Sequence, residues 1–162
     1  MLCNIIQSDV VVLEAWYTPE NLDQVGPTRL VAFSEGTNPW ESNIHLGHDG
    51  TQASLRIRIR PEKQHTELID DVFTEAGRPY HLVMWFADGV LHLSVDGEEV
   101  FTKDIGRDIS WWSDFYPLNV GNEFTRDRGL EGTLHGLSIR NTAPTPGTIA
   151  DWFANPPSGV RG

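Results

Sequence analysis

The sequence predicts an all-β protein built from short antiparallel strands. The clearest stretch is residues 80–102, which read YHLVMWFADGVLHLSVDGEEVFT. Within it, Leu91 and Leu93 alternate with His92 and Ser94, the period of two that a strand with one buried face requires. An Asp-Gly pair stands at each of the two breaks between apolar runs, where a tight turn needs positive φ angles. Fifteen glycines and ten prolines in 162 residues indicate many further turns.

Four strands are expected before these hairpins. Residues 10–17 are apolar on both faces, which is typical of a central strand that is covered on both sides. Residues 29–34 and 43–48 follow as two more strands, and residues 53–60 show the cleanest alternation in the chain. One face of that last strand carries Ala53, Leu55, Ile57 and Ile59, and the other carries Ser54, Arg56, Arg58 and Arg60.

The polar segment of residues 61–75 predicts a loop with a short strand near residues 68–73. Beyond the hairpins and a loop, residues 116–120 and 133–140 are the next two strands. In the second of these the apolar residues change parity at Gly136, which predicts a β-bulge there.

One helix is expected near the C-terminus. Thr145 is a good N-cap, and Pro146 suits the first helical position because it lacks the amide hydrogen that would go unpaired there. The Asn-Pro-Pro run at residues 155–157 ends the helix. Its apolar face is formed by Ile149, Trp152 and Phe153.

Charge and composition exclude several classes of partner and site. The formal net charge is −11, from 23 acidic and 12 basic residues, so nucleic acid and anionic membrane surfaces are poor partners. Cys3 is the single cysteine, which leaves no intramolecular disulfide and no cysteine-based zinc site. No run approaches the ~18 apolar residues of a membrane span. Residues 1–16 lack the basic start of a secretory signal, so we expect any export signal to lie upstream.

Five segments in series resemble one known family. The hairpins at 80–102 are similar to the laminin-G-like branch of the concanavalin A-like lectin/glucanase superfamily, and the others occur in the family's order. These are VLEAWYTP at 12–19, NIHLGHDG at 43–50, PLNVGNEFTRDRGLEG at 117–132, and residues 134–142 with the terminal helix. The resemblance implies a two-sheet antiparallel β-sandwich, a concanavalin A-like jelly roll of about a dozen strands with one short C-terminal helix. It also implies that residues 2–6 supply a shortened form of the family's first strand, unless the chain is trimmed.

The length fits a single domain covering residues 1–162, which we interpret as a module or fragment of a larger protein. Catalytic residues are not predicted. Jelly-roll glycoside hydrolases place paired acids on one strand face as Glu-x-Asp-x-x-Glu, whereas the nearest pair here, Glu67 and Asp70, falls on opposite faces. A glycoside hydrolase or lyase would need two other carboxylates that converge in a cleft.

The histidines and the loop carboxylates are the candidate metal ligands of the chain. His45 and His48 face opposite ways on one strand, so we expect the six histidines to be solvated or half-buried rather than metal ligands. Calcium is the better candidate, since the resembling family often binds it through loop oxygens. The residues that would hold it are Asp49, Asn122, Glu123 and Asp127. The favoured alternative is that Asn122 and Glu123 hydrogen-bond loop backbone.

Exposed aromatic residues are the other candidates for a ligand-binding site. Trp40, Trp111 and Trp112 lie in predicted loops, where an indole either stacks on a sugar or caps a sheet end, and capping is favoured. We expect Trp16, Trp85 and Trp152 to be core. The stripe of Arg56, Arg58 and Arg60 suits a sulfated or uronic glycan, but a solvated face paired with acids is the favoured interpretation. The ligand-binding residues we predict are Trp40, Trp111, Trp112, Asn122 and Arg128.

The leading hypothesis is a non-catalytic recognition or accessory module that binds glycan, on an extracellular or cell-surface bacterial protein. It depends on the resemblance together with the missing pair of acids. The alternative is a structural or protein–protein interaction domain that packs against a neighbouring domain or a second copy. A glycoside hydrolase or lyase with an unrecognised site comes third.

Overall fold

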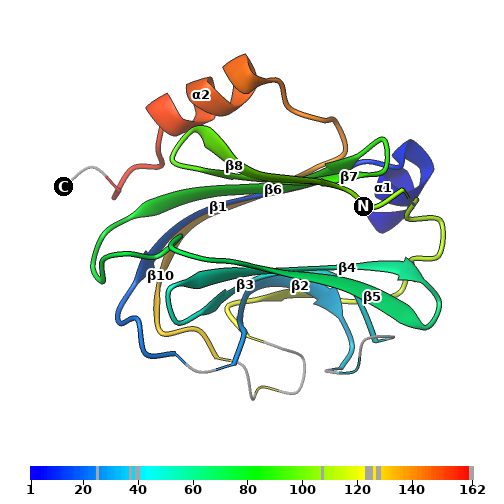
Figure 1. The fold of residues 1–162 in the computed structure, drawn as a ribbon, viewed down its shortest axis with the longest axis horizontal. Helices are drawn as coiled ribbons and strands as arrows, with labels where there is room; N and C mark the ends of the chain where they lie inside the picture. The colour runs from blue at the N-terminus through cyan, green and yellow to red at the C-terminus, as the bar shows by residue number, and fades with distance from the viewer. Residues whose placement is uncertain are drawn as a thin grey trace.

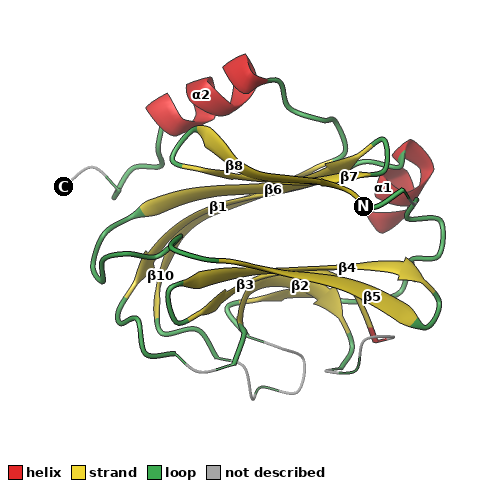
Figure 2. Ribbon diagram, in the orientation of Figure 1, coloured by secondary structure: helices red, strands yellow, loops and turns green. Residues whose placement is uncertain are grey.

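Two five-stranded antiparallel sheets face one another in the computed structural model (Figures 1 and 2). The structure describes residues 1–24, 26–36, 38, 41–106, 108–122, 126 and 129–160. Sheet A has the order β10-β1-β6-β7-β8, and sheet B has the order β5-β4-β3-β2-β9. The described elements are α1 (Leu2–Ser8), β1 (Val11–Pro19), β2 (Thr28–Ser34), β3 (Ser42–Asp49), β4 (Gln52–Arg60), β5 (Lys63–Ile69), β6 (Tyr80–Ala87), β7 (Val90–Val95), β8 (Glu98–Asp104), β9 (Leu118–Val120), β10 (Gly132–Arg140) and α2 (Pro146–Ala154). The predicted two-sheet sandwich is confirmed, with ten strands in the described residues.

The two predicted hairpins are present and are closed by tight turns. Asp88 and Gly89 have φ angles of 52° and 78°, and Asp96 and Gly97 have 53° and 87°. Two successive positive φ angles define the turn whose twist matches that of paired strands, and glycine adopts them without a steric penalty. The hairpins therefore connect β6, β7 and β8 as direct neighbours.

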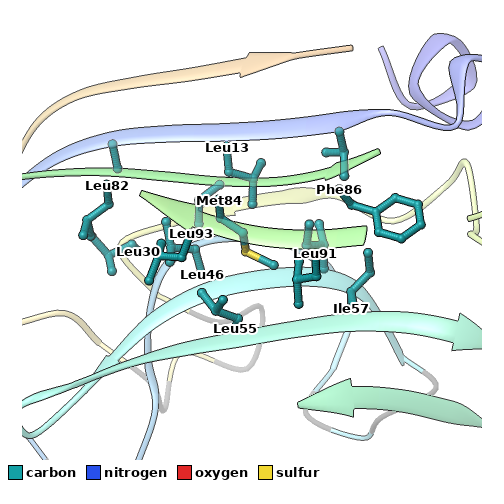
Figure 3. Packing of buried hydrophobic residues seen from close by; sticks show 14 of the residues in the cluster. Leu13, Leu30, Leu46, Leu55, Ile57, Leu82, Met84, Phe86, Leu91 and Leu93 are labelled. Carbon is teal, nitrogen blue, oxygen red and sulfur yellow. The ribbon is translucent and has the colours of Figure 1, made fainter. Parts of the chain in front are cut away.

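The core fills the space between the two sheets, where large aliphatic side chains from both inner faces meet (Figure 3). β1 lies between β10 and β6 and is buried along nearly its whole length, as expected of a central strand. At the open edge between β5 and β8, the Lys103 ammonium and the His65 ring both contact the Glu67 carboxylate. This ion cluster links the two sheets.

The N-terminal segment corrects one expectation. Residues 2–6 form part of helix α1 instead of a shortened strand. Leu2 and Ile5 lie three positions apart, so a helix turns both of them toward the core, where they are buried. The helix ends at Asp9, which has a left-handed φ of 55°. In Figure 1 it lies at one end of the sandwich, between the edges of the two sheets.

The structure corrects one strand prediction and confirms another. The short strand expected near residues 68–73 is β5 at Lys63–Ile69, because a turn after Arg60 returns the chain at once to pair with β4. The bulge predicted at Gly136 is confirmed. Trp16 pairs with Gly136 and Tyr17 pairs with Leu134, so the position between them has no partner on β1.

Helix α2 begins as predicted and covers the outer face of sheet A. The Thr145 hydroxyl accepts a hydrogen bond from the Thr148 amide at 3.1 Å. Ile149 is buried against Val12, Val83 and Trp85, which form a second, smaller apolar cluster outside the sandwich. Of the tryptophans expected in the core, Trp16 and Trp85 are buried and Trp152 is half-buried.

The expectation that the histidines are solvated or half-buried is wrong for His45, His48 and His81, which are fully buried. Each has a polar partner that makes burial affordable: Ser54 for His45 at 3.2 Å, the Tyr17 hydroxyl for His48 at 2.9 Å, and Glu14 for His81 at 3.0 Å. No helix in the described part of the chain is long and apolar enough to cross a membrane.

Candidate functional site

The outer face of sheet B is polar, which is the feature that marks it as a candidate site. Strands β3 and β4 alternate strictly, so that Ile44, Leu46, Leu55 and Ile57 enter the core and their neighbours point outward. We call this outward set the polar face. It comprises Arg29, Asn43, His45, Ser54, Arg56, Arg58 and Asn119.

Strand register places the charged members of the polar face side by side. His45 lies directly opposite Arg56 across the β3–β4 pair, and Arg29 lies opposite Gly47 on the other side of β3. A Cβ atom at Gly47 would lie 2.9 Å from the His45 ring and 2.3 Å from a backbone oxygen of β2. Only glycine therefore leaves room for the His45 ring to lie over β3 at this point.

One segment, residues 108–117, is anchored on the polar face by hydrogen bonds from the strands. The Arg58 guanidinium donates to the side-chain oxygen of Asn43 at 3.0 Å and to the carbonyl of Trp111 at 2.6 Å. The Asn43 amide in turn donates to the carbonyl of Ser113 at 2.7 Å and accepts from its amide at 3.0 Å. These bonds hold the segment in one position relative to the sheet.

The anchored segment carries four aromatic residues, and three of them lie against or beside the polar face in different ways. Trp112 is 5% exposed, its ring packs into the core, and its indole donates to the Arg58 carbonyl at 3.0 Å. It caps the sheet and has no free ring face for a ligand. Trp111 is 55% exposed at the rim, and the Tyr116 ring lies 5.4 Å from the Arg58 guanidinium carbon.

The arginine stripe predicted on β4 is not a solvated face. Arg58 is 6% exposed, Arg56 is half-buried, and only Arg60 of the three is exposed. Arg29, on β2, is also buried and donates to the Pro27 carbonyl at 2.8 Å. A protein of net charge −11 thus gathers three guanidinium groups and one imidazole on a single sheet face. Such a face attracts anionic or hydroxyl-rich groups.

The other predicted site residues are only partly accounted for. Trp40, Glu123, Asp127 and Arg128 lie outside the described residues. Asp49 ends β3, opposite Gln52. Asn122 lies two residues after the end of β9. The described residues contain no group of three or more metal-ligating side chains, and the predicted calcium site stays a prediction.

Glu67, the first member of the acid pair considered for hydrolysis, contacts Lys103 and His65. Burial alone would raise the pKa of Glu67, but hydrogen bonds from Lys103 and His65 outweigh it and hold that pKa below its usual value. Glu67 is therefore kept ionised in the ion cluster between β5 and β8. A carboxylate with a lowered pKa is a poor general acid at neutral pH.

Sequence reasoning missed Arg29, Asn43 and His45 as site residues. The available signal was the alternation in residues 43–47, where polar and apolar residues exchange at every position just as they do in β4. A second group was also missed. Glu14 contacts both His81 and Arg140 on the outer face of sheet A, under helix α2.

Several solved binding domains have the same fold. The carbohydrate-binding domain of the Ruminococcus gnavus IT-sialidase, solved with α2,3-sialyllactose bound, is 12% identical with a TM-score of 0.72, over 88% of this chain and 82% of that one. The binding domain of Paraclostridial Mosquitocidal Protein 1 is 13% identical with a TM-score of 0.64, over 89% of this chain. The binding domain of botulinum neurotoxin DC, in complex with rat synaptotagmin II, is 7% identical with a TM-score of 0.65, over 92% of this chain.

The chain spans 36% of the length of each of the two toxin domains. At these identities the likeness shows the fold. No curated protein sequence matches the chain. A laminin-G family model, described as the concanavalin A-like lectin/glucanases superfamily, matches residues 6–150. The chain belongs to the concanavalin A-like lectin/glucanase superfamily.

Proposed function

We propose that this domain is a non-catalytic recognition module that binds glycans on the polar face of sheet B. The observation that carries the proposal is the gathering of Arg29, Arg56 and Arg58 with Asn43 on one sheet face, rimmed by the exposed indole of Trp111. Guanidinium and amide groups hydrogen-bond hydroxyl and carboxylate oxygens, and an indole stacks on the apolar face of a sugar ring.

The basic character of the face favours acidic glycans over neutral ones. Three arginines in a strongly acidic protein create a local positive potential. This potential attracts the negative charge of a uronic, sialylated or sulfated sugar. The sialyllactose bound to the Ruminococcus gnavus domain, which has the same fold, agrees with this choice of ligand class. By analogy with these relatives we place the module on a secreted or cell-surface bacterial protein.

Glycan-array screening with acidic and neutral glycans, each with and without added calcium, tests the proposal. We expect retention of acidic glycans and about a two- to tenfold loss of affinity in Trp111→Ala, since a stacked ring contributes roughly 0.5–1.5 kcal/mol. Val100→Ala is the matched control, because Val100 is similarly exposed, at 50% against 55% for Trp111, but lies on β8 of the other sheet. No retention of any glycan, or equal binding by Trp111→Ala and the parent, would contradict it.

Calcium remains a separate prediction for Asp49, Asn122, Glu123 and Asp127. If these residues hold calcium beside the polar face, glycan retention should increase when calcium is added and fall again with a chelator. Unchanged retention would mean that glycan binding does not depend on calcium.

A second candidate function is docking of another protein on the edge of sheet B. Phe115 is 88% exposed, and Leu118 and Val120 on the short strand β9 are also exposed. Exposed apolar side chains beside a sheet edge are typical of protein-interaction surfaces. Analytical ultracentrifugation tests the version with a second copy, which requires a concentration-dependent dimer that Phe115→Ser dissociates.

A further inference from the structure

A groove on the opposite side of the molecule, between helix α2 and strands β1 and β10, has the features of a separate binding site. It encloses about 410 Å³, within the roughly 300–1,000 Å³ range of small-molecule sites. We call it the helix groove. Its floor includes Glu14, Trp16, Ser138 and Arg140, and its wall includes Asp151 and Trp152 of α2.

The polar floor of the helix groove is held rigidly. Glu14 is 8% exposed, and its two carboxylate oxygens accept hydrogen bonds from the His81 ring at 3.0 Å and from the Arg140 guanidinium at 2.6 Å. Burial alone would raise the pKa of Glu14, but these two partners outweigh it and hold the pKa below its usual value. The carboxylate is therefore ionised and fixed in direction.

Arg140 is fixed from a second side. Its guanidinium carbon lies 4.0 Å from the centre of the Trp152 ring, a cation–π contact that connects the sheet to the helix. Glu14 is its only hydrogen-bond partner among the described residues, so most of its five donors are available to a ligand.

Several other polar groups of the helix groove also have unused hydrogen-bonding capacity. The Ser138 hydroxyl, the Asp151 carboxylate and the indole nitrogens of Trp16 and Trp152 hydrogen-bond to no other described residue, although the groove brings all four residues together. Donors and acceptors thus surround the half-buried Trp152 ring, whereas Trp16 is 6% exposed and its ring stacks on His81 and Phe153. That combination suits a ligand with several hydroxyl groups and an apolar ring face.

The charge of the helix groove decides between ligand classes. Glu14 and Asp151 are negative and Arg140 is positive, so these three ionisable groups give the lining a net negative charge. An acidic ligand is disfavoured there, in contrast to the arginine-rich polar face on sheet B. We infer that the helix groove is a second site, separate from the polar face, that binds a neutral pyranoside sugar.

Titration of the 15N-labelled domain with neutral methyl glycosides, followed by NMR of the tryptophan indole signals, tests this inference. Methyl β-D-glucopyranoside, methyl β-D-galactopyranoside and methyl α-D-mannopyranoside are the probes, and Trp152→Phe and Trp16→Phe assign the two relevant signals. We expect saturable shifts of the Trp16 and Trp152 signals with at least one probe. Asp151→Ala should weaken that binding about tenfold, the effect of losing one charge-assisted hydrogen bond.

Two controls separate this site from the polar face and from a general charge effect. Glu98→Ala removes an equally exposed acid from β8 and should leave the titration unchanged. Trp111→Ala alters the rim of the polar face and should also leave it unchanged, whatever the outcome for acidic glycans. The inference is overturned if no probe shifts these signals at concentrations up to 50 mM. That limit lies well above a dissociation constant of about 10 mM, which marks weak binding. It is equally overturned if Asp151→Ala binds as the parent does.

Discussion

At the level of single residues, the buried ring of His48 organises one end of the sandwich. Its Nδ1 atom lies 2.9 Å from the Tyr17 hydroxyl and 3.0 Å from the Gln24 amide nitrogen, and its Nε2 atom lies 2.6 Å from the Gly50 carbonyl oxygen. This arrangement is satisfied by a neutral imidazole that carries its proton on Nε2. Burial lowers the pKa of His48 and raises the pKa of Tyr17 to about 12, so both groups stay uncharged.

The lowered pKa of His48 predicts a loss of stability in mild acid. The unfolded chain binds a proton near pH 6.5, whereas the folded protein resists it to lower pH. The contribution is therefore fully present above pH 6.5 and is lost as the pH falls through the folded pKa. We expect the Tm to fall between pH 7.5 and pH 5.5, and to fall less in His48→Gln.

A matched control for this prediction is His135→Gln, which removes a histidine that contacts Thr18 outside the His48 network. Its Tm should change with pH as the parent's does. If His48→Gln shows the same pH dependence as the parent, then another group is responsible for the acid sensitivity.

Residue environments were the hardest feature to predict from the sequence. His48 finds Tyr17 31 positions away, and His81 finds Glu14 67 positions away. A histidine in a strand looks the same in sequence whether its partner is water or a buried side chain. Only the register between distant strands decides which, and that is why three histidines expected near solvent are buried.

At the level of elements, local signals predicted structure well when both partners were close in sequence. The two hairpins, the bulge at Gly136 and the cap of α2 all depend on contacts within a few residues or on a parity change along one strand. Helix α1 was missed although Leu2, Ile5 and Ile6 follow helical spacing. The reason is that the resembling family has a strand at this point of the chain, so a shortened strand was expected. Strand β5 was placed too late because its polar sequence resembles a loop.

A pair of glycine substitutions tests how α2 is seated on the second hairpin. Gly97 has a φ of 87°, and an added Cβ would lie 3.0 Å from the Phe153 ring of α2. We expect Gly97→Ala to lower the free energy of unfolding by about 1–2 kcal/mol, since the left-handed conformation is costly for alanine. Urea unfolding followed by tryptophan fluorescence measures it.

The control substitution, Gly147→Ala, should have the opposite sign. Gly147 lies inside the first turn of α2, and an added Cβ meets nothing closer than 3.7 Å. Alanine is the better helix former, by about 0.5–1 kcal/mol. Equal destabilisation by both substitutions would mean that α2 tolerates no change, and the argument from the turn at Gly97 would fail.

At the level of the whole molecule, charge is distributed unevenly. The net charge is −11, yet the outer face of sheet B carries Arg29, Arg56 and Arg58. The sequence showed the overall charge and the arginine alternation on β4. It did not show that β2 and β3 add their polar residues to the same face, because that depends on which strands become neighbours. The polar face was therefore predicted only in part.

The excess of acidic groups predicts that salt stabilises the domain. Dissolved ions screen the repulsion among surface carboxylates, which otherwise favours the unfolded chain. We expect raising the NaCl concentration from 10 to 200 mM to increase the Tm by about 2–4 °C, the shift that roughly 1 kcal/mol produces in a domain of this size. KCl should act equally. A lower Tm in salt would show that ion pairs such as Lys103–Glu67 outweigh the repulsion.

Strand β8, an edge strand of sheet A, affects whether molecules associate at high protein concentration. It pairs only with β7, and Glu98, Glu99, Lys103 and Asp104 are all exposed along it. A strand from another molecule that extended the sheet here would have to strip water from these charges. The β8 edge of sheet A is therefore protected against edge-to-edge pairing with a second molecule, unlike the β9 edge of sheet B, where Leu118 and Val120 are exposed.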